Sequence, residues 1–80
     1  MLVILTDGKD ELRYQPLPNG KWLQKPFGSQ FRSSRARQIT AVGLTLLLGN
    51  FKQERTATNA VYYAATPRQL YLLGSGRVKF

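Results

Sequence analysis

The chain has 80 residues, of which 42% are hydrophobic and 11% aromatic, and it carries a formal charge of +8 at pH 7. This length fits one small globular domain, residues 1–80, and the apolar content excludes the polar composition typical of disordered proteins. The absence of cysteine and histidine excludes disulfides, thiol nucleophiles and the common zinc-finger ligand sets.

The N-terminal third predicts a β-meander. Residues 2–5 are rich in strand-forming side chains and lead to Asp7-Gly8, a pair that favours a tight hairpin. Pro16 has no amide donor and marks a strand end or an edge. Pro18-Asn19-Gly20 predicts a second turn, after which residues 21–25 form a third strand. The second strand alternates, with Glu11, Arg13 and Gln15 on one side and Leu12, Tyr14 and Pro16 on the other.

The middle of the chain is harder to assign. Residues 26–34 combine a proline and a glycine with polar residues, a composition typical of an exposed loop. Residues 35–48 fit two structures. Helical spacing of apolar residues, Ser34 as an N-cap and Gly49-Asn50 as a stop favour a helix, whereas alternation and β-branched residues fit a strand. We favour the helix.

The remaining segments complete a mixed fold. Residues 52–59 are polar and predict a loop, residues 60–65 and 69–73 predict strands, and residues 77–80 predict a last strand after a glycine-rich turn. We therefore expect an α+β fold, a small, mainly antiparallel sheet of five or six short strands with one helix near residues 35–48. A small all-β closed barrel is the alternative. The expected core residues are Leu12, Tyr14, Val42, Leu46, Val61, Leu70 and Leu72.

Groups that support catalysis are scarce. Only four carboxylates are present, and Asp7, Asp10 and Glu11 crowd around one turn. We interpret these three as solvated turn residues rather than as ligands of a divalent ion. Gly74-Ser75-Gly76 lacks the Walker lysine pattern and the third glycine of a dinucleotide fingerprint. We expect a protein that is not an enzyme and that has no cofactor and no metal.

The positive charge is concentrated in one stretch. Residues 1–20 hold two cations against three acids, whereas residues 21–37 hold five cations and no acid. Such a stretch attracts polyanions over roughly 8 Å at physiological salt. We expect nucleic acid, DNA or RNA, to be the partner, with phosphate contacts that give weak sequence specificity. The five cations are Lys21, Lys25, Arg32, Arg35 and Arg37.

Aromatic residues lie in the same stretch. Trp22 and Phe31 offer flat faces on which bases stack, for about 1–3 kcal/mol per base. Core packing is the alternative role, since aromatic residues usually hold a small domain together. The candidate nucleic-acid-binding residues are Lys21, Trp22, Lys25, Phe31, Arg32, Arg35 and Arg37.

A protein partner is the alternative function. In that case the chain is a small regulatory or inhibitory protein that docks its basic face on an acidic protein surface. The apolar runs at residues 2–5 and 39–48 are too short for a signal peptide and for a membrane span, which takes about 20 residues. We expect a soluble, intracellular and cytoplasmic protein with no membrane span.

Overall fold

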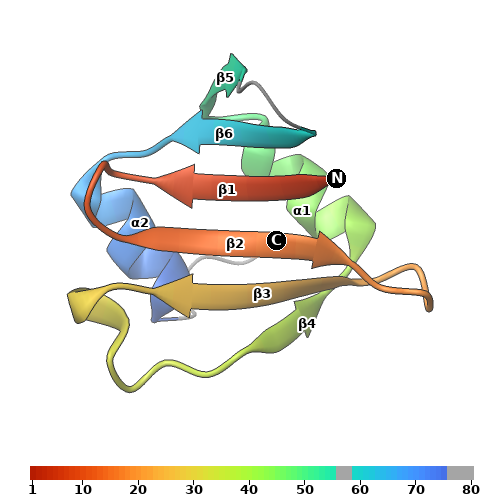
Figure 1. Cartoon of the computed structure of the whole chain (residues 1–80), viewed down its shortest axis with the longest axis horizontal. Helices are drawn as coiled ribbons and strands as arrows, with labels where there is room; N and C mark the ends of the chain where they lie inside the picture. Colours follow the sequence, from red (N-terminus) through yellow and green to blue (C-terminus); the bar gives the residue numbers. More distant parts are fainter. Residues whose placement is uncertain (56–58, 76–80) are drawn as a thin grey trace.

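The protein forms an open six-stranded sheet with two α-helices on one face (Figure 1). The computed structural model describes residues 1–55 and 59–75. This arrangement confirms the expected α+β class with six strands, and it excludes the closed barrel. The strands are β1 (Leu2–Thr6), β2 (Glu11–Pro16), β3 (Trp22–Phe27), β4 (Arg37–Ile39), β5 (Lys52–Arg55) and β6 (Ala60–Ala64). The helices are η1, a 3-10 turn (Ser29–Phe31), α1 (Ala41–Leu48) and α2 (Pro67–Gly74).

Strand β1 lies inside the sheet, whose order is β4-β3-β2-β1-β6-β5. It pairs antiparallel with β2 and parallel with β6, and every other pairing in the sheet is antiparallel. Leu5 thus lies between Leu12 of β2 and Tyr63 of β6. Interior strands often have consecutive apolar residues in their sequence, and β1 does so with the buried Val3, Ile4 and Leu5.

The expected β-meander is confirmed, and its two turns follow from local hydrogen bonds. Asp7 Oδ1 accepts from the backbone N–H groups of Asp10 (2.8 Å) and Lys9 (2.9 Å), and these bonds hold the pKa of Asp7 below its ordinary value of 3.8. At the second turn, Asn19 Oδ1 accepts from the backbone N–H of Lys21 at 2.9 Å. Gly20 adopts a φ of 82° in that turn, a conformation that favours glycine.

Residues 35–48, expected as one helix, contain both candidate structures in turn. Arg37–Ile39 forms β4 against β3, and only Ala41–Leu48 is helical. Helix α1 begins here because the Thr40 hydroxyl accepts from the backbone N–H of Gly43 at 3.0 Å. The N-cap is therefore Thr40 and not Ser34 as expected.

The strand expected at residues 69–73 is wrong, because this segment forms helix α2. Thr66 Oγ1 accepts from the backbone N–H of Gln69 at 3.2 Å, and Gln69 Oε1 accepts from the backbone N–H of Thr66 at 3.1 Å. This reciprocal capping box, with Pro67 at the first helical position, starts the helix. Leu70 and Leu73 lie one turn apart and are buried on the sheet.

Two further expectations concern the second half of the chain. Part of the loop expected at residues 52–59 is strand β5, which pairs antiparallel with β6. Its four residues are all exposed at a sheet edge, and that exposure explains their polar sequence. The strand expected at residues 77–80 lies outside the described residues. None of the described helices is long and apolar enough to cross a membrane.

The core lies between the helices and one face of the sheet. Burial confirms the expectation for Leu12, Tyr14 and Leu70, while Val61 and Leu72 are only half-buried. The expectation is wrong for Val42 and Leu46, which are 70% and 61% exposed. Because α1 begins at Ala41, its inner side carries other residues. The buried core comprises Val3, Leu5, Leu12, Tyr14, Phe31, Ile39, Leu44, Leu47, Leu70 and Leu73.

Candidate nucleic-acid interface

The five cations of residues 21–37 lie along the β3 and β4 side of the sheet. Lys21 and Arg32 are exposed, the first just before β3 and the second just after η1. After Arg32 the chain returns beside β3 and brings Arg35 and Arg37 to the same edge (Figure 1). Lys25 lies within β3 itself. We call these five residues the basic edge.

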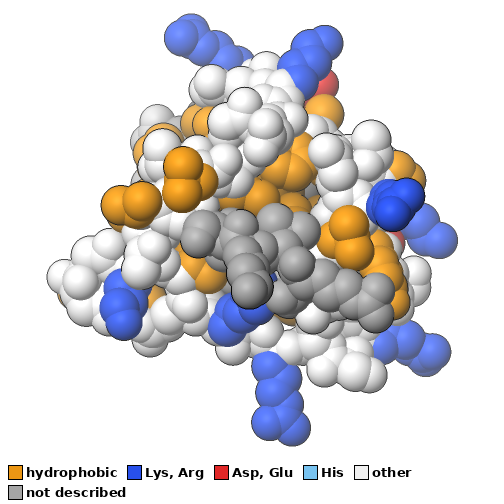
Figure 2. Space-filling model, turned by 180° about the vertical axis from the view of Figure 1, so that it is seen from behind, with side chains coloured by type: hydrophobic (Ala, Val, Ile, Leu, Met, Phe, Trp, Pro, Cys, Tyr) orange, Lys and Arg blue, Asp and Glu red, His pale blue; other side chains and the backbone are white. Residues whose placement is uncertain are grey.

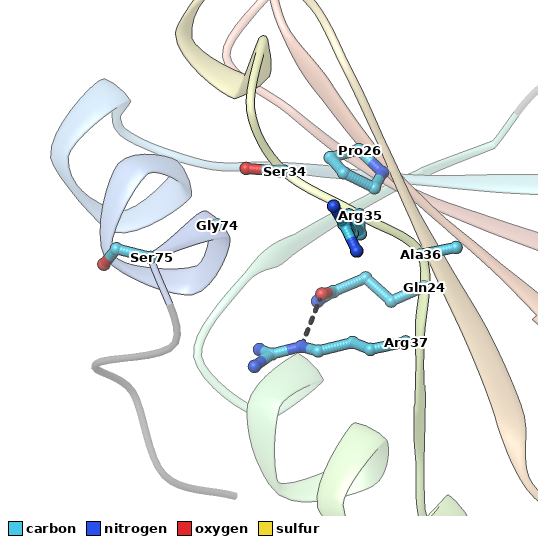
Figure 3. Close-up of a pocket in the computed structure, with 8 residues that line it drawn as sticks. All are labelled: Gln24, Pro26, Ser34, Arg35, Ala36, Arg37, Gly74 and Ser75. Carbon is cyan, nitrogen blue, oxygen red and sulfur yellow. Dashed lines mark hydrogen bonds between the residues drawn. The ribbon is translucent and has the colours of Figure 1, made fainter.

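Two of these arginines line a pocket of about 280 Å³ (Figure 3). Arg35 and Arg37 come from the segment that enters β4, and Gln24 from the neighbouring strand β3. Ser75, at the end of α2, lies on the other side of the pocket (Figure 3). The pocket therefore combines two guanidinium groups with an amide and hydroxyl groups. Its lining is Gln24, Pro26, Ser34, Arg35, Ala36, Arg37, Gly74 and Ser75.

Hydrogen bonds connect this pocket to the core. The buried Gln24 donates from Nε2 to the Tyr14 hydroxyl at 2.6 Å, and its Oε1 accepts from Arg37 Nε at 2.8 Å. Arg37 Nη2 also donates to the backbone oxygen of Leu73 at 3.2 Å. A cation at this position complements the negative end of the α2 dipole. These hydrogen bonds to Gln24 and Leu73 orient the Arg37 guanidinium beside the pocket.

Burial dominates the titration of Tyr14. The side chain has no exposed surface, and burial raises the pKa of Tyr14 from 10.0 to about 12. The hydrogen bond with Gln24 and the charge of Arg37 oppose this effect only in part. At physiological pH the phenol is therefore neutral and serves as a structural hydrogen-bond partner.

The two aromatic candidates of the sequence analysis pack with the core. Phe31 is 4% exposed, and its ring lies against Gly74 so closely that a Cβ atom there would overlap it. The ring is therefore not accessible to a base in this structure. Trp22 is half-buried and packs against the same core, beside Leu44 and Leu48 of α1. For Phe31 in particular, the structure places the side chain in the alternative role of core packing.

Sequence reasoning missed other aromatic residues, which lie on the sheet face without helices. Because Trp22 and Gln24 of β3 face the helices, Phe27 lies on the opposite face, where it is 41% exposed. The guanidinium of Arg13 lies 4.2 Å from the centroid of the Phe27 ring. Tyr62 of β6 belongs to this face too, since Tyr63 packs on the core. The alternation of polar and apolar residues in the sequence of β2 is the signal that could have predicted this face.

Of the four acidic residues, Asp7, Asp10 and Glu54 lie away from the basic edge or are buried. Glu54 is on β5, at the opposite edge of the sheet, and Asp7 holds the first turn. Asp10, expected as a solvated turn residue, is only 5% exposed because its carboxylate packs against Gly28 at the end of β3. Within residues 1–55 and 59–75, no three acidic side chains are grouped so that they could hold a metal ion.

The helix face offers a different surface. Apolar side chains are visible at several places on this face, and most of the Lys and Arg side chains in view project from its outline (Figure 2). On this face, Val42 and Leu46 of α1 and Tyr71 of α2 are exposed apolar residues.

Comparisons with protein-family models, curated proteins and solved structures found no match to this chain.

Proposed function

We propose that this protein binds nucleic acid, DNA or RNA, through the basic edge and catalyses no reaction. The observation that carries the proposal is the position of Arg35 and Arg37 around one pocket, with Lys21 and Arg32 exposed along the same side of the sheet. The segment that supplies them contains no acid. A polyanion that follows this edge would therefore meet several cations in succession.

The chemistry of the pocket suits a backbone phosphate. Guanidinium groups present paired N–H donors that match phosphate oxygens, and hydroxyl groups add further donors. Arg35, Ser34 and Ser75 provide such groups around the 280 Å³ pocket. Contacts of this kind fix position along a strand and carry no sequence information. Binding is accordingly expected to be salt-dependent and weakly sequence-specific.

A salt titration tests the proposal. The Arg32→Ala/Arg35→Ala variant removes two exposed cations of the basic edge whose side chains make no hydrogen bond within residues 1–55 and 59–75. The slope of log affinity against log salt should flatten by about 1.5 units, because two phosphates lose their partners. Arg37 is left in place because it bonds Gln24 and Leu73.

A matched control removes the same charge elsewhere. Arg55→Ala/Arg68→Ala changes two exposed arginines of β5 and α2 and should leave the slope nearly unchanged. Equal flattening in both variants would show that binding follows net charge and not the basic edge. If the parent protein binds neither DNA nor RNA at low salt, the proposed function is wrong.

A second candidate function has one observation in its favour. Val42 and Leu46 of α1 are strongly exposed apolar side chains, and apolar side chains do not bind nucleic-acid phosphates. They suit a protein partner whose acidic surface would meet the basic edge. Polyglutamate distinguishes the candidates, because a nucleic-acid-binding protein should prefer DNA or RNA to this acidic polypeptide at equal ionic strength.

A further inference from the structure

Within residues 1–55 and 59–75, no helix lies over one face of the sheet. Both α-helices pack on the face that carries Val3, Leu5 and Tyr14, and Figure 1 shows the sheet from the other side. Strand alternation assigns to this uncovered face one residue from each of four neighbouring strands. The register aligns them in a row, in the order Lys25 of β3, Arg13 of β2, Ile4 of β1 and Tyr62 of β6.

Two cations in this row are direct cross-strand neighbours. Arg13 of β2 pairs with Lys25 of β3, and like charges in this position destabilise a sheet. Glu11 reduces the repulsion, since its Oε1 accepts from Arg13 Nη2 at 3.0 Å. Within the described part of the chain, however, Arg13 Nε is shielded from solvent and has no hydrogen-bond partner. An anion placed between Arg13 and Lys25 would offset the remaining repulsion.

Flat side chains lie on either side of this pair. Phe27 is 41% exposed beneath the Arg13 guanidinium, at the end of the strand that holds Lys25. Tyr62 lies two strands away on the other side. Ile4, between them, is only 3% exposed, and its cross-strand neighbours on this face are Arg13 and Tyr62.

We propose that this uncovered face binds single-stranded nucleic acid, with a phosphate between Arg13 and Lys25 and bases stacked on Phe27 and Tyr62. The proposal rests on the proposed function and names its substrate. Lys25 belongs to the basic edge as well, so the edge and the uncovered face share one cation. With strands about 4.8 Å apart, the row from Lys25 to Tyr62 spans roughly 14 Å.

The shape of the face selects single strands over duplexes. A duplex hides the faces of its bases in the stack, whereas a single strand offers them to aromatic side chains. A broad sheet also cannot enter the major groove, which accommodates a helix or a two-stranded ribbon. The charge pair distinguishes nucleic acid from an apolar protein partner, because a buried protein contact would leave Arg13 and Lys25 facing each other without an anion.

Substitution of one tyrosine tests the stacking. Tyr62→Leu keeps an apolar side chain beside Ile4 but removes the aromatic face, so affinity for oligo-dT should fall about tenfold with an unchanged salt slope. Affinity for a duplex should not change. Tyr71→Leu is the matched control, since Tyr71 is 48% exposed on α2, on the other side of the sheet, and oligo-dT affinity should stay at the parent value. Phe27→Leu provides an independent second test.

A measurement on the parent protein avoids any effect of substitution on folding. In an NMR titration with oligo-dT, amide shifts should concentrate at Arg13, Lys25 and Tyr62. Shifts concentrated at Val42 and Leu46 would overturn the proposal. If polyglutamate produced the same shifts at equal affinity, the partner would be an acidic protein and the proposal would be wrong.

Folded Tyr62→Leu and Phe27→Leu variants with parental oligo-dT affinity would also overturn it. The proposed function would survive that last result if Arg32→Ala/Arg35→Ala still flattened the salt slope.

Discussion

Gln24 donates a 2.6 Å hydrogen bond to the buried hydroxyl of Tyr14, and this bond links the core to the basic pocket. The orientation of the Gln24 amide follows from its other partner. Arg37 can only donate, so the amide must present its oxygen to Arg37 and its nitrogen to Tyr14. Gln24 therefore connects Tyr14 in the core to Arg37, one of the two arginines that line the pocket.

Removal of this amide should destabilise the fold. Gln24→Leu leaves the Tyr14 hydroxyl buried without a partner, which costs about 1–3 kcal/mol of unfolding free energy. Urea denaturation measures the loss. Gln15→Leu is the control, since Gln15 is exposed on β2 and should change stability by less than about 0.5 kcal/mol. In the Gln24→Leu/Tyr14→Phe double variant the losses should not add, because one hydrogen bond is removed in both single variants. Additive losses would contradict the coupling.

Tyr14 should also make the fold sensitive to alkali. Its pKa rises from 10.0 in the unfolded chain to about 12 in the folded protein. Between these values the unfolded state has released a proton that the folded state retains. The stabilisation is complete below pH 10 and is lost as the pH rises toward 12, by about 1.4 kcal/mol per pH unit.

Urea unfolding of Tyr14→Phe at about pH 8 and about pH 11 isolates this effect. The variant should lose less stability between the two pH values than the parent does. Tyr71→Phe, at an exposed tyrosine, should keep the parental dependence. Identical pH dependence in parent and Tyr14→Phe would show that the phenol does not control alkaline unfolding.

The sequence predicts those parts of the fold whose signals are local. Asp7-Gly8 and Pro18-Asn19-Gly20 locate the two turns of the meander, and the alternation of β2 locates its buried side. Helix α2 was missed although Thr66 and Gln69 carry the capping-box spacing, because the apolar residues that follow also fit a strand. The parallel pairing of β1 with β6 joins residues more than fifty positions apart, and no local pattern encodes it.

The structure brings the five predicted cations to one side of the sheet, whereas it buries Phe31 and half-buries Trp22. Charged side chains stay near the surface in most folds, so their clustering in the sequence predicts a basic surface. Whether an aromatic ring is buried depends on the face of the strand that carries it. Trp22 and Phe27 lie in the same strand, an odd number of residues apart, and therefore point to opposite faces. The helices cover the face that carries Trp22, and only the tertiary structure shows which face of the strand they cover.

The contact between Phe31 and α2 predicts an asymmetry between two glycines. A Cβ at Gly74 would overlap the Phe31 ring, whereas a Cβ at Gly49, the C-cap of α1, would come no closer than 3.5 Å to the Leu46 oxygen. Gly74→Ala should therefore destabilise the protein by about 1–3 kcal/mol through overpacking. Gly49→Ala should be neutral or stabilise it by up to about 1 kcal/mol. Thermal unfolding compares the two, and equal effects would show that Phe31 does not pack on α2 as described.

The last prediction tests which side of α1 faces the sheet. Leu46 and Leu47 are adjacent and chemically identical, yet Leu46 is 61% exposed and Leu47 only 6%. Leu47→Ala should cost about 2–5 kcal/mol of unfolding free energy, because it opens a cavity against the core. Leu46→Ala should change stability by less than about 0.5 kcal/mol, since it removes only surface contacts. Chemical denaturation of both variants decides between this orientation and the one expected from the sequence, which places Leu46 in the core. The reverse order of losses would mean that α1 begins elsewhere than at the Thr40 cap, because a shift of one residue rotates the inner side of the helix by about 100°.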